Sequence, residues 1–154
     1  MRQPIGHKKG LTLIEVLIAV AILGVSLLAI ASMFPTSTRV INESGKQTRA
    51  FSLARWMAEQ VLATSSFADI PLYNGQSTAQ ANFNTGSAVV DVNLTTWKET
   101  VEEVPAGGLP EGVGQITVMV TGAAPARLAT VTVEVTWPND RGLSAVLTTQ
   151  VSET

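Results

Sequence analysis

The side chains that build most catalytic and metal sites are scarce in this sequence. The 154-residue chain has no cysteine, and its only histidine is His7, near the N-terminus. Without cysteine it can form no disulfide, thiol nucleophile or cysteine-ligated metal centre. The body of the chain also lacks histidine-based triads, a phosphate-binding glycine loop, a GxSxG elbow and a dinucleotide fingerprint. The sequence therefore predicts neither an enzyme nor a bound cofactor.

One acidic group, Glu99, Glu102 and Glu103, has the composition of a possible metal site. Calcium takes about six to eight oxygen ligands, usually from a compact loop rich in Asp and Asn. Three glutamates on one predicted strand do not supply that set, and a solvated, charged strand edge is the favoured interpretation. We expect no metal site.

The charge is low, and the apolar residues are concentrated in one place. Charged residues make up 14% of the chain and hydrophobic residues 45%, whereas an average soluble domain is roughly 25% charged. Ten Lys and Arg against twelve Asp and Glu give a net charge of −2, so no nucleic-acid partner is expected. The apolar excess lies in Val16 to Phe34, a run without a charge. A bilayer core needs about 20 such residues in a helix, so this run predicts a single membrane span.

The residues before the span indicate its orientation. Arg2, Lys8 and Lys9 precede the apolar run, and the first charge beyond it is Arg39. Because cytoplasmic flanks carry the excess of Lys and Arg, the N-terminus is expected in the cytoplasm and the rest of the chain outside it. Lys8 and Lys9 are thus predicted to be a topology signal.

The junction between the basic leader and the span carries a specific spacing. Gly10 ends the leader, the hydrophobic Leu11 follows, and Glu15 is the fifth residue after the glycine. A carboxylate at the edge of hydrocarbon is costly, which makes it a functional candidate. Taken alone, Glu15 is more simply interpreted as a carboxylate that extends into the headgroups or becomes protonated. Because Gly10 has no side chain, the backbone around it can enter a protease site in an extended conformation.

This arrangement resembles the class III signal of type IV pilins and type II secretion pseudopilins. The resemblance implies that prepilin peptidase cuts between Gly10 and Leu11 and that the new N-terminus, Leu11, is methylated. It also implies that Glu15 attracts the N-terminal ammonium of an adjacent subunit during assembly. Leu11 departs from the commoner Phe at this position.

Two other interpretations of the N-terminus remain open from the sequence. Signal peptidase could cut after Ala31 in Ala29-Ile30-Ala31 and release an exported soluble binding domain. The long apolar run and the acid at its start argue against that interpretation. Alternatively, the leader could stay uncut on a permanent single-span membrane protein.

The helix is expected to extend well beyond the span. Pro35 should kink it without necessarily ending it. Apolar residues then recur with helical spacing, and Arg55 can reach Glu59 one turn later. The stripe consists of Ala50, Leu53, Ala54, Met57 and Val61. We therefore predict an amphipathic helix over residues 36–67 that packs on a domain core.

The remainder predicts a loop followed by a sheet. Residues 68–87 read as an irregular connection, in which Tyr73 and Phe83 either anchor the loop or face a neighbouring subunit. Period-two alternation over residues 88–152 predicts an antiparallel sheet with one buried face and one Thr-rich wet face. The expected strands are Ala88–Leu94, Thr96–Val104, Gln115–Thr121, Leu128–Trp137 and Leu143–Ser152.

The predicted fold class is α+β: a long N-terminal helix, transmembrane in its first half, packed on an antiparallel sheet. The expected organisation is a cleaved leader over residues 1–10, an assembly helix over 11–35 and an extracytoplasmic head over 36–154. By resemblance this is a minor subunit, most similar to V-type minor pilins or I-type pseudopilins. Its implied partners are other pilin subunits, prepilin peptidase, an inner-membrane assembly platform and the membrane itself. The sequence does not separate pilus, type II secretion and DNA-uptake systems.

Overall fold

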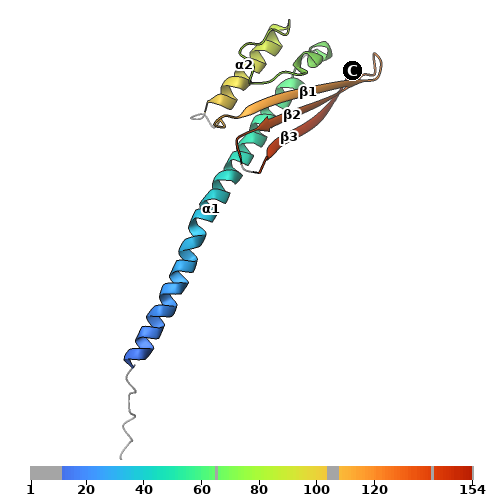
Figure 1. Ribbon diagram of the computed structural model, residues 1–154. Coiled ribbons are helices and arrows are strands. Elements are labelled where there is room, and N and C mark those ends of the chain that lie inside the picture. The colour runs from blue at the N-terminus through green and yellow to red at the C-terminus, as the bar shows by residue number, and fades with distance from the viewer. Residues whose placement is uncertain (1–11, 65, 104–107, 140, 154) are drawn as a thin grey trace, which may run out of the picture. The chain divides into compact units, whose positions relative to one another are not determined.

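The computed structural model describes residues 12–64, 66–103, 108–139 and 141–153. Its elements follow the order α1 (Leu13–Leu62), the 3₁₀ helix η1 (Phe67–Tyr73), α2 (Ala88–Glu102), β1 (Val113–Thr121), β2 (Leu128–Thr136) and β3 (Ser144–Ser152) (Figure 1). The chain divides into two compact units, and the boundary along the sequence lies between Asn42 and Glu43. The sequence placed the start of the head at residue 36.

Helix α1 begins and ends close to its predicted limits. It continues through Pro35, as expected, and ends at Leu62 rather than near residue 66. In the second unit its buried residues are the five of the predicted stripe together with Ala58. Arg55 Nε donates to Glu59 Oε1 over 2.8 Å, which confirms the predicted pair. The bend expected at Pro35 stays a prediction.

The segment after the loop is a helix, so the two strands predicted for Ala88–Leu94 and Thr96–Val104 are wrong. Helix α2 buries Val90, Leu94, Trp97 and Val101 completely. These residues are spaced four, three and four apart, which places them on one helical face. The residues that enter the core therefore follow helical spacing, and the local period-two alternation that suggested strands does not match the observed burial.

The three remaining predicted strands are confirmed. They form an antiparallel sheet in the order β1-β2-β3, in which Ile116, Val133 and Leu147 lie side by side across the strands. The inward side chains of β2 are fully buried, and its other face carries Thr130, Thr132 and Thr136, as the alternation predicted. The sheet therefore has one core face and one Thr-rich face.

Trp97 connects the layers of the second unit. Its indole is fully buried, and Nε1 donates to the carbonyl oxygen of Leu53 on α1 over 3.2 Å. The same ring covers Gly114 on β1, where an added Cβ would lie 2.3 Å from Trp97 Cη2. Such a distance is far inside van der Waals contact, so the close packing of α2 on β1 requires glycine at position 114.

Candidate functional site at the N-terminal helix

The sequence placed the site at the start of the apolar helix. Lys8, Lys9, Gly10 and Leu11 lie outside the described residues. The residues that the structure describes begin with Thr12, and Glu15 is in the first turn of α1. The structure thus gives the setting of Glu15, while the cleavage and topology residues stay sequence predictions.

Thr12 directly precedes α1 as its N-cap, a role that was not predicted from the sequence. Its carbonyl oxygen accepts from the amides of Glu15 at 3.0 Å and Val16 at 3.2 Å. The carbonyl of an N-cap residue accepts in this way, and Thr is among the favoured N-caps. The spacing Thr12-x-x-Glu15 is also that of a capping box, a signal from which the helix start could have been predicted.

Glu15 is exposed on the first turn of α1. Unpaired amides give this end of a helix a partial positive charge, which favours a carboxylate there. Within residues 12–64, Glu15 donates a hydrogen bond from its backbone amide to Thr12, and its carboxylate forms no hydrogen bond or ion pair. Its carboxylate is therefore positioned by the helix and open to a group from outside the described chain.

The apolar run forms an exposed surface along the first unit. Every residue from 12 to 42 is exposed, including Leu13 at 83%. Helix α1 is long and apolar enough to cross a membrane, and no part of its most apolar stretch is buried within the protein. A helix that is apolar all round needs an apolar environment, so this segment fits membrane anchoring of the domain that follows.

The polar residues of this run are hydrogen bonded within the helix. Ser26 Oγ donates to the carbonyl oxygen of Ile22 over 2.9 Å, and Ser32 Oγ donates to that of Ala29 over 2.8 Å. Back-bonding of this kind leaves no hydroxyl donor facing hydrocarbon. The two serines are therefore compatible with a spanning helix.

Residues 5–31 match the family model described as the prokaryotic N-terminal methylation motif. The chain carries a type IV pilin-like prepilin signal. The matched range includes Gly10, Leu11 and Glu15 together with most of the apolar run. A long helix followed by a three-stranded antiparallel sheet is also a pilin-like α+β architecture. No curated protein and no solved structure matches the chain.

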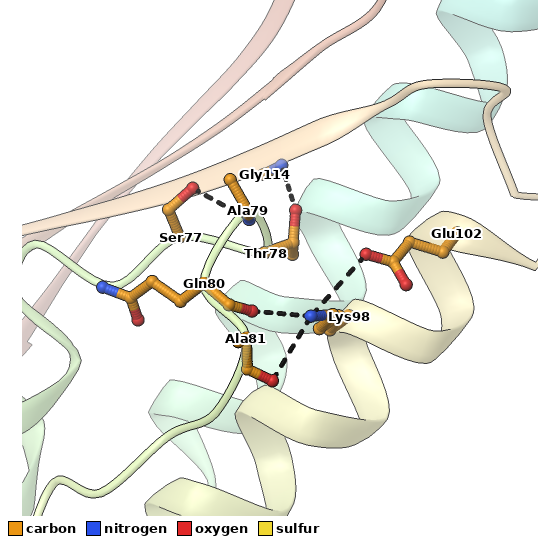
Figure 2. A network of polar contacts seen from close by, with 8 residues as sticks. All are labelled: Ser77, Thr78, Ala79, Gln80, Ala81, Lys98, Glu102 and Gly114. Atoms are coloured by element: carbon orange, nitrogen blue, oxygen red, sulfur yellow. Dashed lines mark hydrogen bonds and ion pairs between the residues drawn. The ribbon is translucent and has the colours of Figure 1, made fainter.

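In this pilin-like head, the loop between α1 and α2 is held in place by hydrogen bonds between side chains and backbone groups. Figure 2 shows Lys98 of α2 reaching the loop, where its Nζ donates to the carbonyl oxygens of Gln80 at 2.6 Å and Ala81 at 3.5 Å. The same ammonium lies 3.9 Å from Glu102 Oε1. Thr78 Oγ1 accepts from the amide of Gly114 over 2.9 Å. The loop is thereby attached to both α2 and β1.

The connection predicted as irregular over residues 68–87 begins instead with the 3₁₀ helix η1, on which Tyr73 lies. Tyr73 and Phe83 anchor this connection to the domain. Tyr73 is fully buried, and its hydroxyl accepts from Asn93 Nδ2 over 2.8 Å and lies 3.2 Å from Thr64 Oγ1. Phe83 packs half-buried against the core. Of the two alternatives left open by the sequence, the structure supports anchoring.

The acidic group does not have the predicted setting. Glu99 and Glu102 lie on α2 and Glu103 is its C-cap, so they do not form a charged strand edge. All three are exposed. Within the described ranges, no group of three or more His, Cys, Asp or Glu side chains is placed to hold a metal ion.

Two further contacts join residues for which the sequence predicted no partner. Trp137 Nε1, just beyond β2, donates to Glu43 Oε1 over 2.9 Å. At the opposite end of β2, the Arg127 guanidinium forms a two-point contact with the Glu153 carboxylate at 2.7 and 2.5 Å. Hydrogen bonding to Arg127 lowers the pKa of Glu153, and the partner bond raises the pKa of Arg127. Arg127 also lies 5.1 Å from the ring centroid of Phe67.

Proposed function

We propose that this protein is a structural subunit of a type IV pilus or a related pseudopilus. It is inserted as a single-span precursor, cleaved after Gly10, methylated on Leu11 and assembled through α1. The match of residues 5–31 to the methylation motif carries this proposal. Because that match includes the cleavage region, it favours processing at Gly10 over signal-peptidase cleavage after Ala31.

The proposal assigns assembly to the surface of α1. Apart from Glu15, Gly24, Ser26 and Ser32, this surface is apolar, and every residue from 13 to 34 is exposed. Before assembly it is buried in the bilayer, and afterwards against the same segment of neighbouring subunits. Both environments remove apolar area from water, at roughly 25 cal/mol per Å². The same helix thus serves as membrane anchor and packing surface.

Glu15 supplies the specific contact within this apolar surface. Its carboxylate pairs with the methylated ammonium of Leu11 in the next subunit. An unpaired charge in an apolar interior is strongly destabilising, whereas a paired one is tolerated. The pairing therefore fixes the axial position at which two helices can pack. Leader removal is a precondition, because it creates the ammonium.

The remaining parts of the proposal concern location and partners. The basic residues Lys8 and Lys9 keep the N-terminus in the cytoplasm, so the head lies outside it. The partners are prepilin peptidase, an inner-membrane assembly platform and other pilin-like subunits. The absence of cysteine excludes the C-terminal disulfide loop of many major pilins, which favours a minor subunit. The role is structural and not enzymatic.

The assembly step is tested by Glu15→Ala, with Glu59→Ala as the matched control. Both residues are exposed glutamates on α1, but only Glu15 lies in the apolar segment. We expect Glu15→Ala to insert and to lose its leader, while its amount in isolated filaments or membrane complexes falls at least about tenfold. Glu59→Ala should assemble normally. Assembly of Glu15→Ala at the wild-type level would remove the proposed role of Glu15.

A further inference from the structure

The two edges of the sheet differ in how their backbone groups are used. On the β1 edge, the amides of Gly114, Ile116 and Val118 each donate over 2.9 Å to an acceptor within residues 74–78. The loop that precedes α2 therefore closes this edge with bonds to alternate residues. From Gly114 to Val118, the β1 edge is not open to another strand.

The same bonds fix which groups of β3 point outward. The amide of Gly114 points toward the loop and away from β2. Gly114 and the opposite residue on β2, Val135, are therefore a pair without mutual hydrogen bonds, and Val135 points its amide and carbonyl toward β3. Val135 is paired with Ala145. Odd-numbered residues of β3 thus bond to β2, and even-numbered residues direct their amides and carbonyls away from the sheet. Those residues are Ser144, Val146, Thr148, Gln150 and Ser152.

Nothing in the described part of the chain covers this edge. Among those residues, the outward amides and carbonyls of β3 form no backbone hydrogen bond. The strand also contains no charge and no proline from Ser144 to Ser152. Natural edge strands commonly carry charge, proline or a bulge, because an unprotected edge pairs with other strands. Nine regular residues without such protection are suited to pairing.

The core also continues to this edge. The inward side chains Val131 and Val133 of β2 are fully buried, whereas Leu147 and Val151 of β3 pack against the core only half-buried. An added strand would cover the exposed parts of both side chains. A fitting strand has apolar residues toward Leu147 and Val151, hydroxyl or amide residues on the other face, and no charge within the paired stretch.

We propose that the free edge of β3 binds an extended strand from a neighbouring pilin-like subunit. This proposal rests on the proposed function for the class of partner. Main-chain hydrogen bonds provide the affinity, and the alternating side-chain pattern provides the selection, as in other strand-addition complexes. The head then contributes an attachment of its own, separate from the packing of α1.

The test uses the full chain in cells, with a photo-cross-linking residue at Gln150 on β3. The control position is Met119 on β1. Met119 and Gln150 are both paired with Thr130 of β2, and both lie on the exposed face of the sheet. We expect an adduct from position 150 with a chain that carries its own prepilin-type signal. Position 119 should not give this adduct. No adduct at 150, or the same adduct from both positions, overturns the proposal. An adduct with a protein that has no prepilin-type signal overturns the assigned partner.

A proline at Thr148 tests whether the attachment is a strand. Its amide points away from β2, so Thr148→Pro removes an outward donor and keeps the β2–β3 bonds. Thr148→Val keeps the amide and is the matched control. We expect Thr148→Pro to reduce the adduct at least about tenfold and Thr148→Val to retain it. Equal adduct in both variants overturns strand pairing, provided circular dichroism shows that both heads are folded. If Thr148→Pro does not fold, Val146→Pro against Val146→Thr repeats the test at the next outward amide.

These outcomes are separable from failure of the proposed function. Leader removal is read from the mass of the same chain. A cleaved wild-type chain without an adduct overturns the β3 proposal alone. An uncut wild-type chain overturns the proposed function, whatever the cross-linking result.

Discussion

The contact between Gly114 and Trp97 gives a quantitative test of the packing in the head. In Gly114→Ala, the new methyl group would lie 2.3 Å from Trp97 Cη2 and 2.4 Å from Cζ2. Ordinary carbon–carbon contacts are about 3.5–4.0 Å, so the ring or the strand must move by more than 1 Å. Because Trp97 is fully buried and its Nε1 is bonded to Leu53, neither shift is free of cost.

Overpacking of this kind lowers the free energy of unfolding by about 1–3 kcal/mol. For a domain of this size, that corresponds to a fall in Tm of about 5–20 °C. The assay is thermal unfolding of the full chain in detergent, followed by near-ultraviolet circular dichroism. The matched control is Gly45→Ala on α1, where an added Cβ meets nothing within 4 Å. That change should be neutral or stabilising by up to about 1 kcal/mol.

A double-mutant cycle separates the contact from other effects of the alanine. In a Trp97→Leu background the ring is gone, so Gly114→Ala should cost much less than in the wild-type chain. A Tm of Gly114→Ala within about 2 °C of wild type would refute the close packing of α2 on β1. So would an equal cost of Gly114→Ala in both backgrounds.

Three other predictions concern the loop and the C-terminus. Tyr73→Phe removes the acceptor of Asn93 and should lower the free energy of unfolding by about 1–2 kcal/mol in denaturant titrations; no change would show that the bond contributes nothing. Lys98→Met should speed proteolysis of residues 79–86 severalfold, because the loop loses its ammonium contacts, and an unchanged cleavage rate would contradict that role. Because its bond to Arg127 lowers the pKa of Glu153, the stabilisation is present above the unfolded pKa of about 4.3 and is lost as the pH falls through the folded pKa. Tm should therefore fall more steeply below pH ~4.3 in the wild type than in Glu153→Gln, and parallel Tm profiles would contradict this.

The helix α1 and the three C-terminal strands could be predicted because their signals are local and regular. An apolar run and a stripe at helical spacing defined α1, and strict alternation of Val with Thr defined β2. Pro35 did not mislead the prediction, because the helical stripe resumes after it. Thr12 could have been predicted as the helix start from its spacing to Glu15.

Helix α2 was misread because two patterns coincide in its first half. Ala88, Val90, Val92 and Leu94 alternate with other residues, which is the pattern of a strand. In the structure Val92 is 63% exposed, so it belongs to no core face. Only the longer spacing from Val90 to Trp97 reveals the helix. A short alternating window cannot distinguish the two when valines also occupy solvent positions.

Local sequence patterns give little indication of the hydrogen bonds that attach the loop to β1 and α2, or of the pairs at the two ends of β2. The loop closes the β1 edge mainly through backbone groups, and Lys98 reaches backbone carbonyls of the same loop. The Trp137–Glu43 and Arg127–Glu153 pairs join residues far apart in the chain. Side-chain type does not specify such partners, so they become visible only in the folded structure.

Processing at Gly10 is tested by the intact mass of the chain purified from cells that contain prepilin peptidase. We expect a mature protein that begins at Leu11, without residues 1–10, and carries one added methyl group on its N-terminus. A chain that retains residues 1–10, or one that begins at Ser32, would contradict the account.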